Sequence, residues 1–234
     1  MYNDKEKMSK NEEPNMFEAI VLPKLDCLSP TLNSTLLKIV EEAGELARAT
    51  LAFLPYERLK GQEIAALSVA KQALENVNGE LLDVAQTCVT MIFVMEDSYS
   101  IEIAELIEQH LDKLERKGYK FIRTQQYRID EEKNAKCLSL PKLEIPEVTL
   151  LTTACKIQEE LGEFTQYLGK KAGASGEKNC LAEHEVMVGS ALELLDMAQC
   201  CFTMMYILAE RYEVDIDGLA AQHVEKLRRK GYCS

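Results

Sequence analysis

The sequence predicts an all-α protein, and three observations carry that prediction. Ala, Leu, Glu and Lys are plentiful, whereas the 234 residues include only 11 Gly, 6 Pro and no Trp. This composition favours helices, because such side chains lose little rotamer freedom in them. Apolar residues recur at intervals of three and four, the period of a helix with one buried face. No alternating run of β-branched residues indicates a sheet.

Charge and hydropathy narrow the class of protein. The formal net charge is −12 and the pI is about 4.9, and so acidic a surface repels phosphate backbones and anionic lipids. We therefore expect no nucleic-acid partner and no membrane partner. The N-terminus has no apolar signal region, and the longest apolar stretch, residues 84–95, is too short to span a bilayer. A soluble, cytoplasmic protein is expected.

Eight cysteines are scattered along the chain, and no two of them form a Cys-x-x-Cys pair. Several lie inside apolar helical stretches, so we expect free, buried thiols in a reducing cytosol rather than a disulfide framework or a zinc site. These residues are Cys27, Cys88, Cys137, Cys155, Cys180, Cys200, Cys201 and Cys233.

The sequence repeats itself, and the repeat organises the whole chain. Leu-Pro-Lys-Leu at residues 22–25 returns 118 residues later, as does Glu-Glu-x-Gly-Glu at 41–45. Further on, ELLDVAQ at 80–86 returns as ELLDMAQ, and QHLDKLERKGY at 109–119 returns as QHVEKLRRKGY, both after 113 residues. Such fixed offsets indicate a tandem duplication.

The duplication divides the chain into four segments. Residues 1–20 form a polar tail that we expect to be disordered. Residues 21–120 form the first repeat and residues 140–234 the second. Residues 121–139 are polar and have no sustained period, so we interpret them as a linker with a helical start.

The first predicted helix covers about residues 30–53. Ser29 is its expected N-cap, and Pro30 occupies the first helical position, where the missing N–H costs nothing. A connector follows at residues 55–61.

Two further helical segments complete the first repeat, and the second repeat follows the same plan. A long pattern covers about residues 63–97, with a bend expected at 76–79, where Asn and Gly interrupt it. The last helix, about residues 101–116, ends in basic residues before Gly118, which is a regular C-terminal stop.

Pairs of carboxylates recur on these helices. Glu42 and Glu45 are three residues apart, so on a helix both point to one side, and Glu80 and Asp83 do the same on the next one. Like charges at the edge of a core are costly without a counter-charge. Mg²⁺ would supply that charge, because it prefers oxygen ligands. The matching acids of the second repeat are Glu160, Glu163, Glu193 and Asp196.

Three alternative roles for these acids fit the sequence less well. A single Glu-x-x-Glu pair is most often a solvated helix face, but both pairs occur in both repeats, which favours a site. A di-iron carboxylate bundle requires Glu-x-x-His pairs, and no histidine of this chain has an acid three residues before it. No spaced set of His or Cys supports zinc.

A basic cluster closes each repeat. Lys113, Arg116 and Lys117 can share one side of a helix and reach phosphate oxygens. The same residues also suit a helix C-terminus, where cations interact favourably with the dipole, so both roles stay open. A histidine on a helix, such as His110 or its counterpart His223, is more often structural than catalytic. The matching cations of the second repeat are Lys226, Arg229 and Lys230.

Together, Glu-Glu-x-x-Glu on one helix, Glu-x-x-Asp on the next and a closing Lys-x-x-Arg-Lys-Gly-Tyr resemble the MazG-like branch of the all-α NTP pyrophosphatases. The resemblance covers about residues 22–119 and 140–232. It implies cleavage of a nucleoside triphosphate to monophosphate and pyrophosphate, often for house-cleaning of the nucleotide pool. It also implies that the four acids of each repeat bind Mg²⁺, or Mn²⁺ in its place. Glu41 and Glu159 are implied as extra ligands or water activators, and they are our candidate catalytic residues.

The resemblance also bears on architecture. Typical family members are single-copy and assemble as dimers or tetramers, so this fused chain is expected to pack as an intramolecular pseudo-dimeric helix bundle, with further self-association open. The gap between the acidic pairs is at the long end for the family, and no nucleoside-binding residue can be carried over. The alternative functions are a non-catalytic nucleotide- or Mg²⁺-binding helical module and an interaction scaffold.

Overall fold

Helices dominate the structure, a computed structural model that describes residues 19–123, 127–130, 135–173 and 181–234. The predominantly helical character predicted from the sequence is confirmed. The helices are α1 (Leu32–Phe53), the 3₁₀ turn η1 (Leu54–Tyr56), α2 (Gly61–Ala66), α3 (Ser68–Tyr99), α4 (Ile103–Arg116), α5 (Leu150–Ala172), α6 (Glu183–Tyr212) and α7 (Ile216–Arg229). The strands are β1 (Leu22–Pro23), β2 (Tyr127–Asp130) and β3 (Ala135–Leu138).

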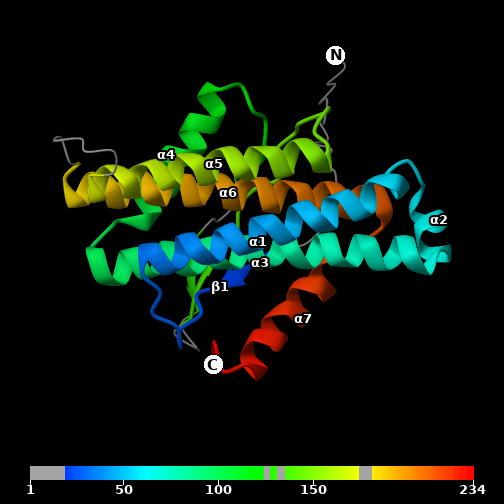
Figure 1. Ribbon diagram of the computed structural model, residues 1–234, viewed down its shortest axis with the longest axis horizontal. Helices are drawn as coiled ribbons and strands as arrows, with labels where there is room; N and C mark the ends of the chain where they lie inside the picture. The colour runs from blue at the N-terminus through cyan, green and yellow to red at the C-terminus, as the bar shows by residue number, and fades with distance from the viewer. Residues whose placement is uncertain (1–18, 124–126, 131–134, 174–180) are drawn as a thin grey trace, which may run out of the picture.

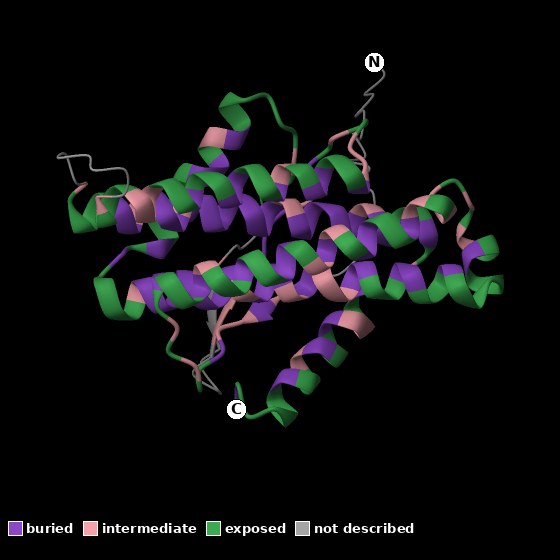
Figure 2. Cartoon of the chain, viewed as in Figure 1, coloured by how far each residue is buried: buried purple, intermediate pink, exposed green. Residues whose placement is uncertain are grey.

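The four long helices form two layers (Figure 1). α1 packs on α3, α5 packs on α6, and the layers meet where α3 contacts α6 and α1 contacts α5. Figure 2 shows buried residues along the helix faces between the layers and exposed residues on the outer faces. The largest fully buried side chains include Phe53, Phe93, Phe164 and Phe202.

Two short helices, α4 and α7, which we call the closing helices, lie on opposite sides of the bundle (Figure 1). α4 follows α3 in the sequence but packs chiefly on α6. α7 follows α6 but packs more on α3. Each closing helix therefore borders a long helix from the other half of the chain.

The helices α1 and α5 begin with the same cap. Thr31 Oγ1 accepts from Ser34 N at 3.2 Å, and Ser34 Oγ accepts from Thr31 N at 2.9 Å. Thr149 and Thr152 make the same two hydrogen bonds at the start of α5. Such reciprocal bonds satisfy backbone N–H groups that a helix start leaves without partners. The predicted N-cap at Ser29 is therefore wrong by two residues.

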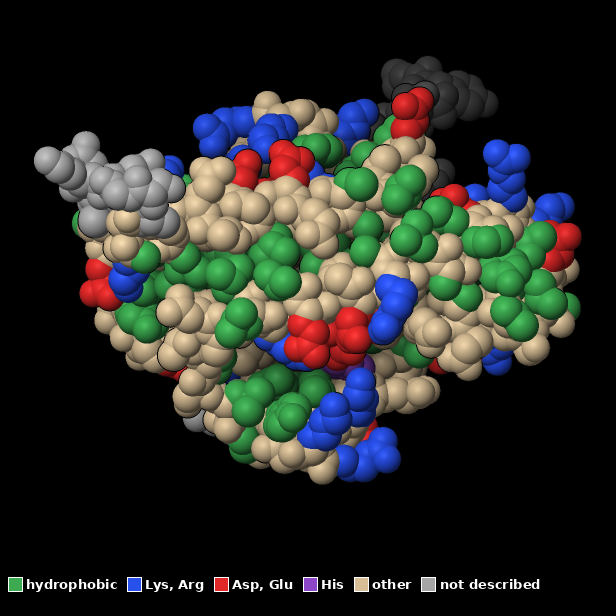
Figure 3. All heavy atoms as spheres, viewed as in Figure 1, with side chains coloured by type: hydrophobic (Ala, Val, Ile, Leu, Met, Phe, Trp, Pro, Cys, Tyr) green, Lys and Arg blue, Asp and Glu red, His purple; other side chains and the backbone are tan. Residues whose placement is uncertain are grey.

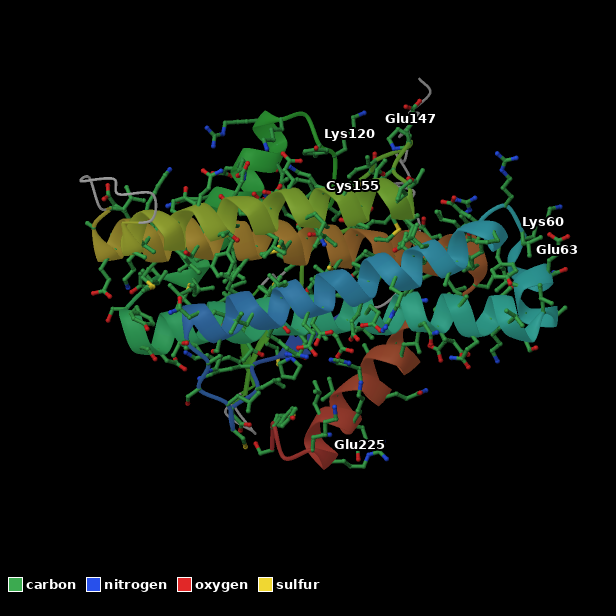
Figure 4. All side chains as sticks on the ribbon, viewed as in Figure 1. Lys60, Glu63, Lys120, Glu147, Cys155 and Glu225 are labelled. Atoms are coloured by element: carbon green, nitrogen blue, oxygen red, sulfur yellow. The ribbon has the colours of Figure 1, made fainter. Side chains whose placement is uncertain are left out.

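The helical pattern predicted over about residues 63–97 is interrupted near its start, at Leu67, rather than at residues 76–79. Leu67 adopts an extended backbone, with φ −108° and ψ 101°, and separates α2 from α3. α2 has its own cap, because Lys60 N donates to Glu63 Oε2 at 2.8 Å (Figure 4). The interruption expected at 76–79 does not occur, because α3 continues through these residues.

The segment interpreted as a linker contains strands instead of a helical start. β3 pairs antiparallel with both β1 and β2, which gives a three-stranded sheet in the order β1-β3-β2. Because β1 comes from the beginning of the first repeat, this pairing depends on the tertiary fold, and no local pattern announces it.

The predicted disordered tail lies outside the described residues, except for residues 19 and 20. Ile20 is buried, and its backbone N–H donates to Tyr206 Oη at 2.8 Å. The ordered chain therefore begins earlier than residue 21.

Two helices, α3 and α6, are long and apolar enough to cross a membrane by length and composition. The apolar stretch at residues 84–95 is too short to indicate this, because both helices extend well beyond their most apolar part. In the fold, 78% and 83% of their apolar windows are buried inside the protein. Such burial is typical of the central helices of a bundle.

Cys27, Cys88, Cys155, Cys200, Cys201 and Cys233 are free thiols. Cys88, Cys201 and Cys233 are buried, as expected, whereas Cys27 and Cys155 are exposed. Cys155 lies on α5 (Figure 4). Burial of every thiol was therefore too broad an expectation.

Candidate functional site

Three acids of the first half converge between α1 and α3. Each of Glu42, Glu45 and Glu80 offers a carboxylate oxygen within 4.8 Å of the other two. Burial and the charge of Asp83 raise the pKa of Glu42, against the effect of Lys38. Burial and the charges of Glu45 and Asp83 raise the pKa of Glu80. Burial and mutual repulsion therefore both disfavour the charged forms of these carboxyl groups.

The second half repeats this cluster between α5 and α6. Glu160, Glu163 and Glu193 bring carboxylate oxygens within 4.8 Å of one another. Burial, a hydrogen bond with Glu160 and the charge of Asp196 raise the pKa of Glu193 to about 8. Glu193 Oε2 is buried without a hydrogen-bond partner. A buried carboxylate oxygen with no donor is costly unless something else binds it.

The remaining predicted acids, Asp83 and Asp196, face the closing helix of the other half. His110 Nδ1 of α4 lies 3.0 Å from Asp196 Oδ1, and Lys113 forms an ion pair with the same carboxylate. His223 Nδ1 of α7 lies 3.6 Å from Asp83 Oδ1. Lys226, also on α7, has its Nζ 3.8 Å from Asp83 Oδ2. Each half therefore supplies the acids of one site and the cations of the other.

We call the set Glu42, Glu45, Glu80 and Asp83, with His223 and Lys226, the first site. The set Glu160, Glu163, Glu193 and Asp196, with His110 and Lys113, is the second site.

Burial and the contacts across each site shift the pKa values of Asp196, Lys113 and His223. Although burial raises it, the contacts with His110 and Lys113 lower the pKa of Asp196. Although burial lowers it, the hydrogen bond to Asp196 raises the pKa of Lys113. Burial lowers the pKa of His223 despite the nearby charge of Asp83. At neutral pH, Asp196 and Lys113 are therefore both charged, and His223 is neutral.

A cavity adjoins each site. The one at the first site has a volume of about 350 Å³, and its walls include Glu42, Glu45, Asp83 and Lys226. The one at the second site has about 260 Å³, and its walls include Glu160 and Asp196. Figure 3 shows acidic side chains gathered where α1 faces α7, with basic side chains of α7 beside them. Acids and cations thus meet across an open space.

The ends of the closing helices are shaped to border these cavities. Gly118 and Gly231 adopt left-handed backbones, with φ of 87° and 74°, and the chain turns back so that Tyr232 N bonds Leu227 O at 3.1 Å. This is a glycine-terminated helix stop. Its effect is to bring the Lys-Gly-Tyr ends to the opposite half. Lys230 and Tyr232 line the first cavity, and Lys117 and Tyr119 line the second.

Some predicted site residues lie elsewhere. Glu41 and Glu159 are exposed, and each lies 3.1 Å from a lysine, Lys38 or Lys156. Neither glutamate lines a described cavity. Arg116 and Arg229 are also exposed and do not line the cavities. Their Nε atoms donate instead to the carbonyls of Asp112 and Glu225. Figure 4 labels Glu225 on α7.

Several further cavity residues were not predicted from the sequence. Lys38 contacts Glu42, and Lys156 Nζ lies 2.6 Å from Glu160. Both lysines precede their glutamates by four residues, a spacing that could have revealed them. Gln86 and Gln199 also line the cavities, and their Nε2 atoms donate to Pro23 O and Pro141 O, both at 2.7 Å. The repeated Leu-Pro-Lys-Leu sequence, which contains both prolines, could have revealed these glutamine contacts.

The first cavity also contains buried oxygens without protein partners. Thr35 Oγ1 and Gln86 Oε1 have no hydrogen-bond partner, and their residues are only 2% and 3% exposed. Both residues line the cavity. Unsatisfied groups of this kind in a polar pocket indicate a place for a ligand or water.

Neither protein-family models, nor curated proteins, nor solved structures match this chain. Function is therefore inferred from the chemistry of the two sites.

Proposed function

We propose that the protein is a Mg²⁺-dependent nucleoside triphosphate pyrophosphohydrolase, which converts an NTP or dNTP to the monophosphate and pyrophosphate. One observation carries the proposal: Glu42, Glu45 and Asp83 line a cavity that Lys226 and Lys230 of the opposite half also line. Carboxylates suit a hard cation, and lysines suit phosphate oxygens, so both ends of a metal–triphosphate have a partner. Cytoplasmic house-cleaning of the nucleotide pool is the role that the resemblance suggests.

The resemblance to MazG-like enzymes supports the proposal and extends it to architecture. We infer that the two repeats pair as an intramolecular pseudo-dimer. The crossed closing helices support this, because a two-fold arrangement requires each contact to occur twice with exchanged partners. Cys88 and Cys201 occupy matching positions in the repeats, and the pKa of Cys201 is raised first by its burial and then by Cys88 nearby. Matching residues meet in this way near a two-fold axis.

The glutamate clusters fit Mg²⁺ better than a softer metal. Their donors are oxygens alone, with neither His nor Cys among the grouped ligands that the structure describes. Glu193 Oε2, which has no hydrogen-bond partner, is a further oxygen that a metal ion could bind. Bound there, Mg²⁺ would neutralise the charge of the triphosphate and polarise its phosphoryl oxygens.

The chain's own residues would divide the remaining work. Lys226 and Lys230 bind phosphate oxygens and stabilise the negative charge that develops on the departing pyrophosphate. A carboxylate of the site that does not bind the metal would accept the proton of the attacking water. The water oxygen bonds to the α-phosphorus, and the bond from that phosphorus to the bridging oxygen breaks. His223 orients Asp83 rather than touching the substrate.

A pyrophosphate-release assay over a panel of NTPs and dNTPs with Mg²⁺ tests the proposal. Glu45→Gln and Glu163→Gln should each remove part of the activity, and the double variant should remove all of it. Glu105→Gln, an exposed change on α4 away from both acid clusters, is the matched control and should keep full activity.

Absence of pyrophosphate release from every nucleotide would overturn the enzymatic proposal. Calorimetry then identifies the second candidate: tight nucleotide binding without turnover would favour a non-catalytic binding module. A rise in melting temperature with Mg²⁺ that disappears in a Glu42→Ala/Glu160→Ala variant would count against a mere interaction scaffold.

A further inference from the structure

The two sites have the same types of residue at matching positions. They differ in how closely the closing helix approaches the aspartate. In the second site, Lys113 pairs with Asp196 and His110 approaches to 3.0 Å. In the first site, the same atoms of His223 and Lys226 stand 3.6 and 3.8 Å from Asp83. The aspartate side chain is 10% exposed in the second site and 26% in the first. The second carboxylate is thus already neutralised and covered by protein.

The cavities differ in the same direction. The first cavity is lined by Glu45 and Lys226 as well as Glu42 and Asp83. The second is smaller, and of these positions only Glu160 and Asp196 line it, while Glu163 and Lys113 do not. A triphosphate entering the first cavity meets metal ligands and a lysine at once. In the second cavity, that lysine is engaged with Asp196.

The packing of the closing helices accounts for this difference. α4 buries Leu106, Ile107 and Leu111 against the bundle. At the matching positions α7 has Leu219, Ala220 and Val224, of which only the alanine is buried. Larger buried side chains fix a helix more firmly, because more apolar area leaves water. α4 therefore holds Lys113 against Asp196, whereas α7 holds Lys226 at a distance.

We propose that the two sites work unequally: the first site is the open metal and substrate site, and the second is closed by Lys113, which must leave Asp196 before a metal ion can bind fully. The proposal rests on the proposed function, since it assumes that both acid clusters are metal sites. It adds that Lys113 regulates the second one as a tethered cation.

Titration with Mn²⁺ alone, followed by the electron paramagnetic resonance signal of the free ion, tests this. The wild-type protein should bind one Mn²⁺ tightly and a second one about ten- to a hundredfold more weakly, since the second must displace an ion pair. Glu42→Gln should remove the tight site, and Glu160→Gln should leave it.

Lys113→Met should strengthen the weak site until the two become nearly equal. Lys226→Met is the matched control and should leave the second site weak. Lys113→Gln provides a second variant of similar size, and circular dichroism verifies that each variant is folded. In a Glu42→Gln background, Lys113→Met should also increase Mn²⁺ occupancy of the remaining site.

The outcomes separate the two proposals. Two equal Mn²⁺ sites in the wild-type protein, or a weak site that Lys113→Met and Lys113→Gln leave unchanged, would overturn the inequality and leave the enzymatic proposal standing. No Mn²⁺ binding at either cluster would overturn the metal-dependent function itself, and the inequality with it.

Discussion

The four long helices and the two closing helices are held by different means. α1, α3, α5 and α6 bury aromatic and aliphatic side chains between two layers. α4 and α7 bury one narrow face each, and their lysines reach the aspartates that they cover. The bundle therefore determines whether the chain folds, whereas the closing helices determine how each site is completed. Changes in the two regions should separate stability from site chemistry.

The largest effect is expected in the bundle. Phe202 is fully buried, so Phe202→Ala should lower the free energy of unfolding by about 3–5 kcal/mol, through lost burial and a remaining cavity. Guanidinium unfolding measures this. Leu37, which is 71% exposed, is the control, and Leu37→Ala should change stability by less than about 0.5 kcal/mol. Equal effects would contradict the assigned core.

A smaller loss is expected on a closing helix. Ile107 is 2% exposed on α4, and alanine occupies its matching position, Ala220, on α7. Ile107→Ala should cost about 2–4 kcal/mol and loosen α4, so that hydrogen exchange accelerates in residues 103–116. Exchange that accelerates equally in α3 would show that α4 does not move separately from the bundle.

The pH dependence of stability should reveal the buried acid of the second site. The pKa of Glu193 is raised to about 8 in the folded protein, above the unfolded value of about 4.3. The folded state therefore binds more protons between these values, and the free energy of unfolding should fall as pH rises from about 4.3 to 8. Melting curves over this range measure the fall.

Glu193→Gln removes this titration and should flatten the dependence. Glu80→Gln, at the matching position of the first site, should flatten it less, because Glu80 is only half-buried. A wild-type stability that rises through this pH window would contradict the environment assigned to Glu193.

The smallest effect is expected at Gln199, an amide of α6 that contacts His110 of the closing helix α4. Gln199 donates to Pro141 O and Thr203 Oγ1, and its Oε1 lies 3.4 Å from His110 Nε2. Gln199→Ala should cost about 1–2 kcal/mol. Gln86→Ala removes two such contacts rather than three and should cost less. Thermal unfolding compares the two variants, and a larger cost for Gln86→Ala would contradict this ranking.

Local patterns predicted much of the fold. The period of apolar residues indicated the long helices, and the basic turn before Gly118 placed the end of α4 correctly at Arg116. The break at Leu67 was missed, because leucine favours helix and no Gly or Pro stands near it in the sequence. β3 was missed because one of its partners, β1, lies more than a hundred residues away, and β2 pairs only with β3.

The candidate site was predictable in part for the same reason. Acids three residues apart share a helix face, so the Glu42–Glu45 and Glu160–Glu163 pairs followed from spacing. That Glu80 and Glu193 join them from the next long helix did not. The choice of partner for each aspartate did not, since Lys113 and Asp196 are 83 residues apart. Nor could spacing show that Glu41 faces away from the cavity. Pairings across the bundle depend on how the helices cross, and the sequence of one helix does not encode that angle.

Each closing helix contacts the opposite half of the chain, and this limits how the sequence can change in evolution. A substitution in α4 changes the chemistry of acids encoded in the other half, and a substitution in α7 does the same in return. Duplicated segments that each formed a whole site could diverge independently, and one could decay without harm to the other. Here each site needs residues of both halves, so selection acting on one site also preserves the opposite half.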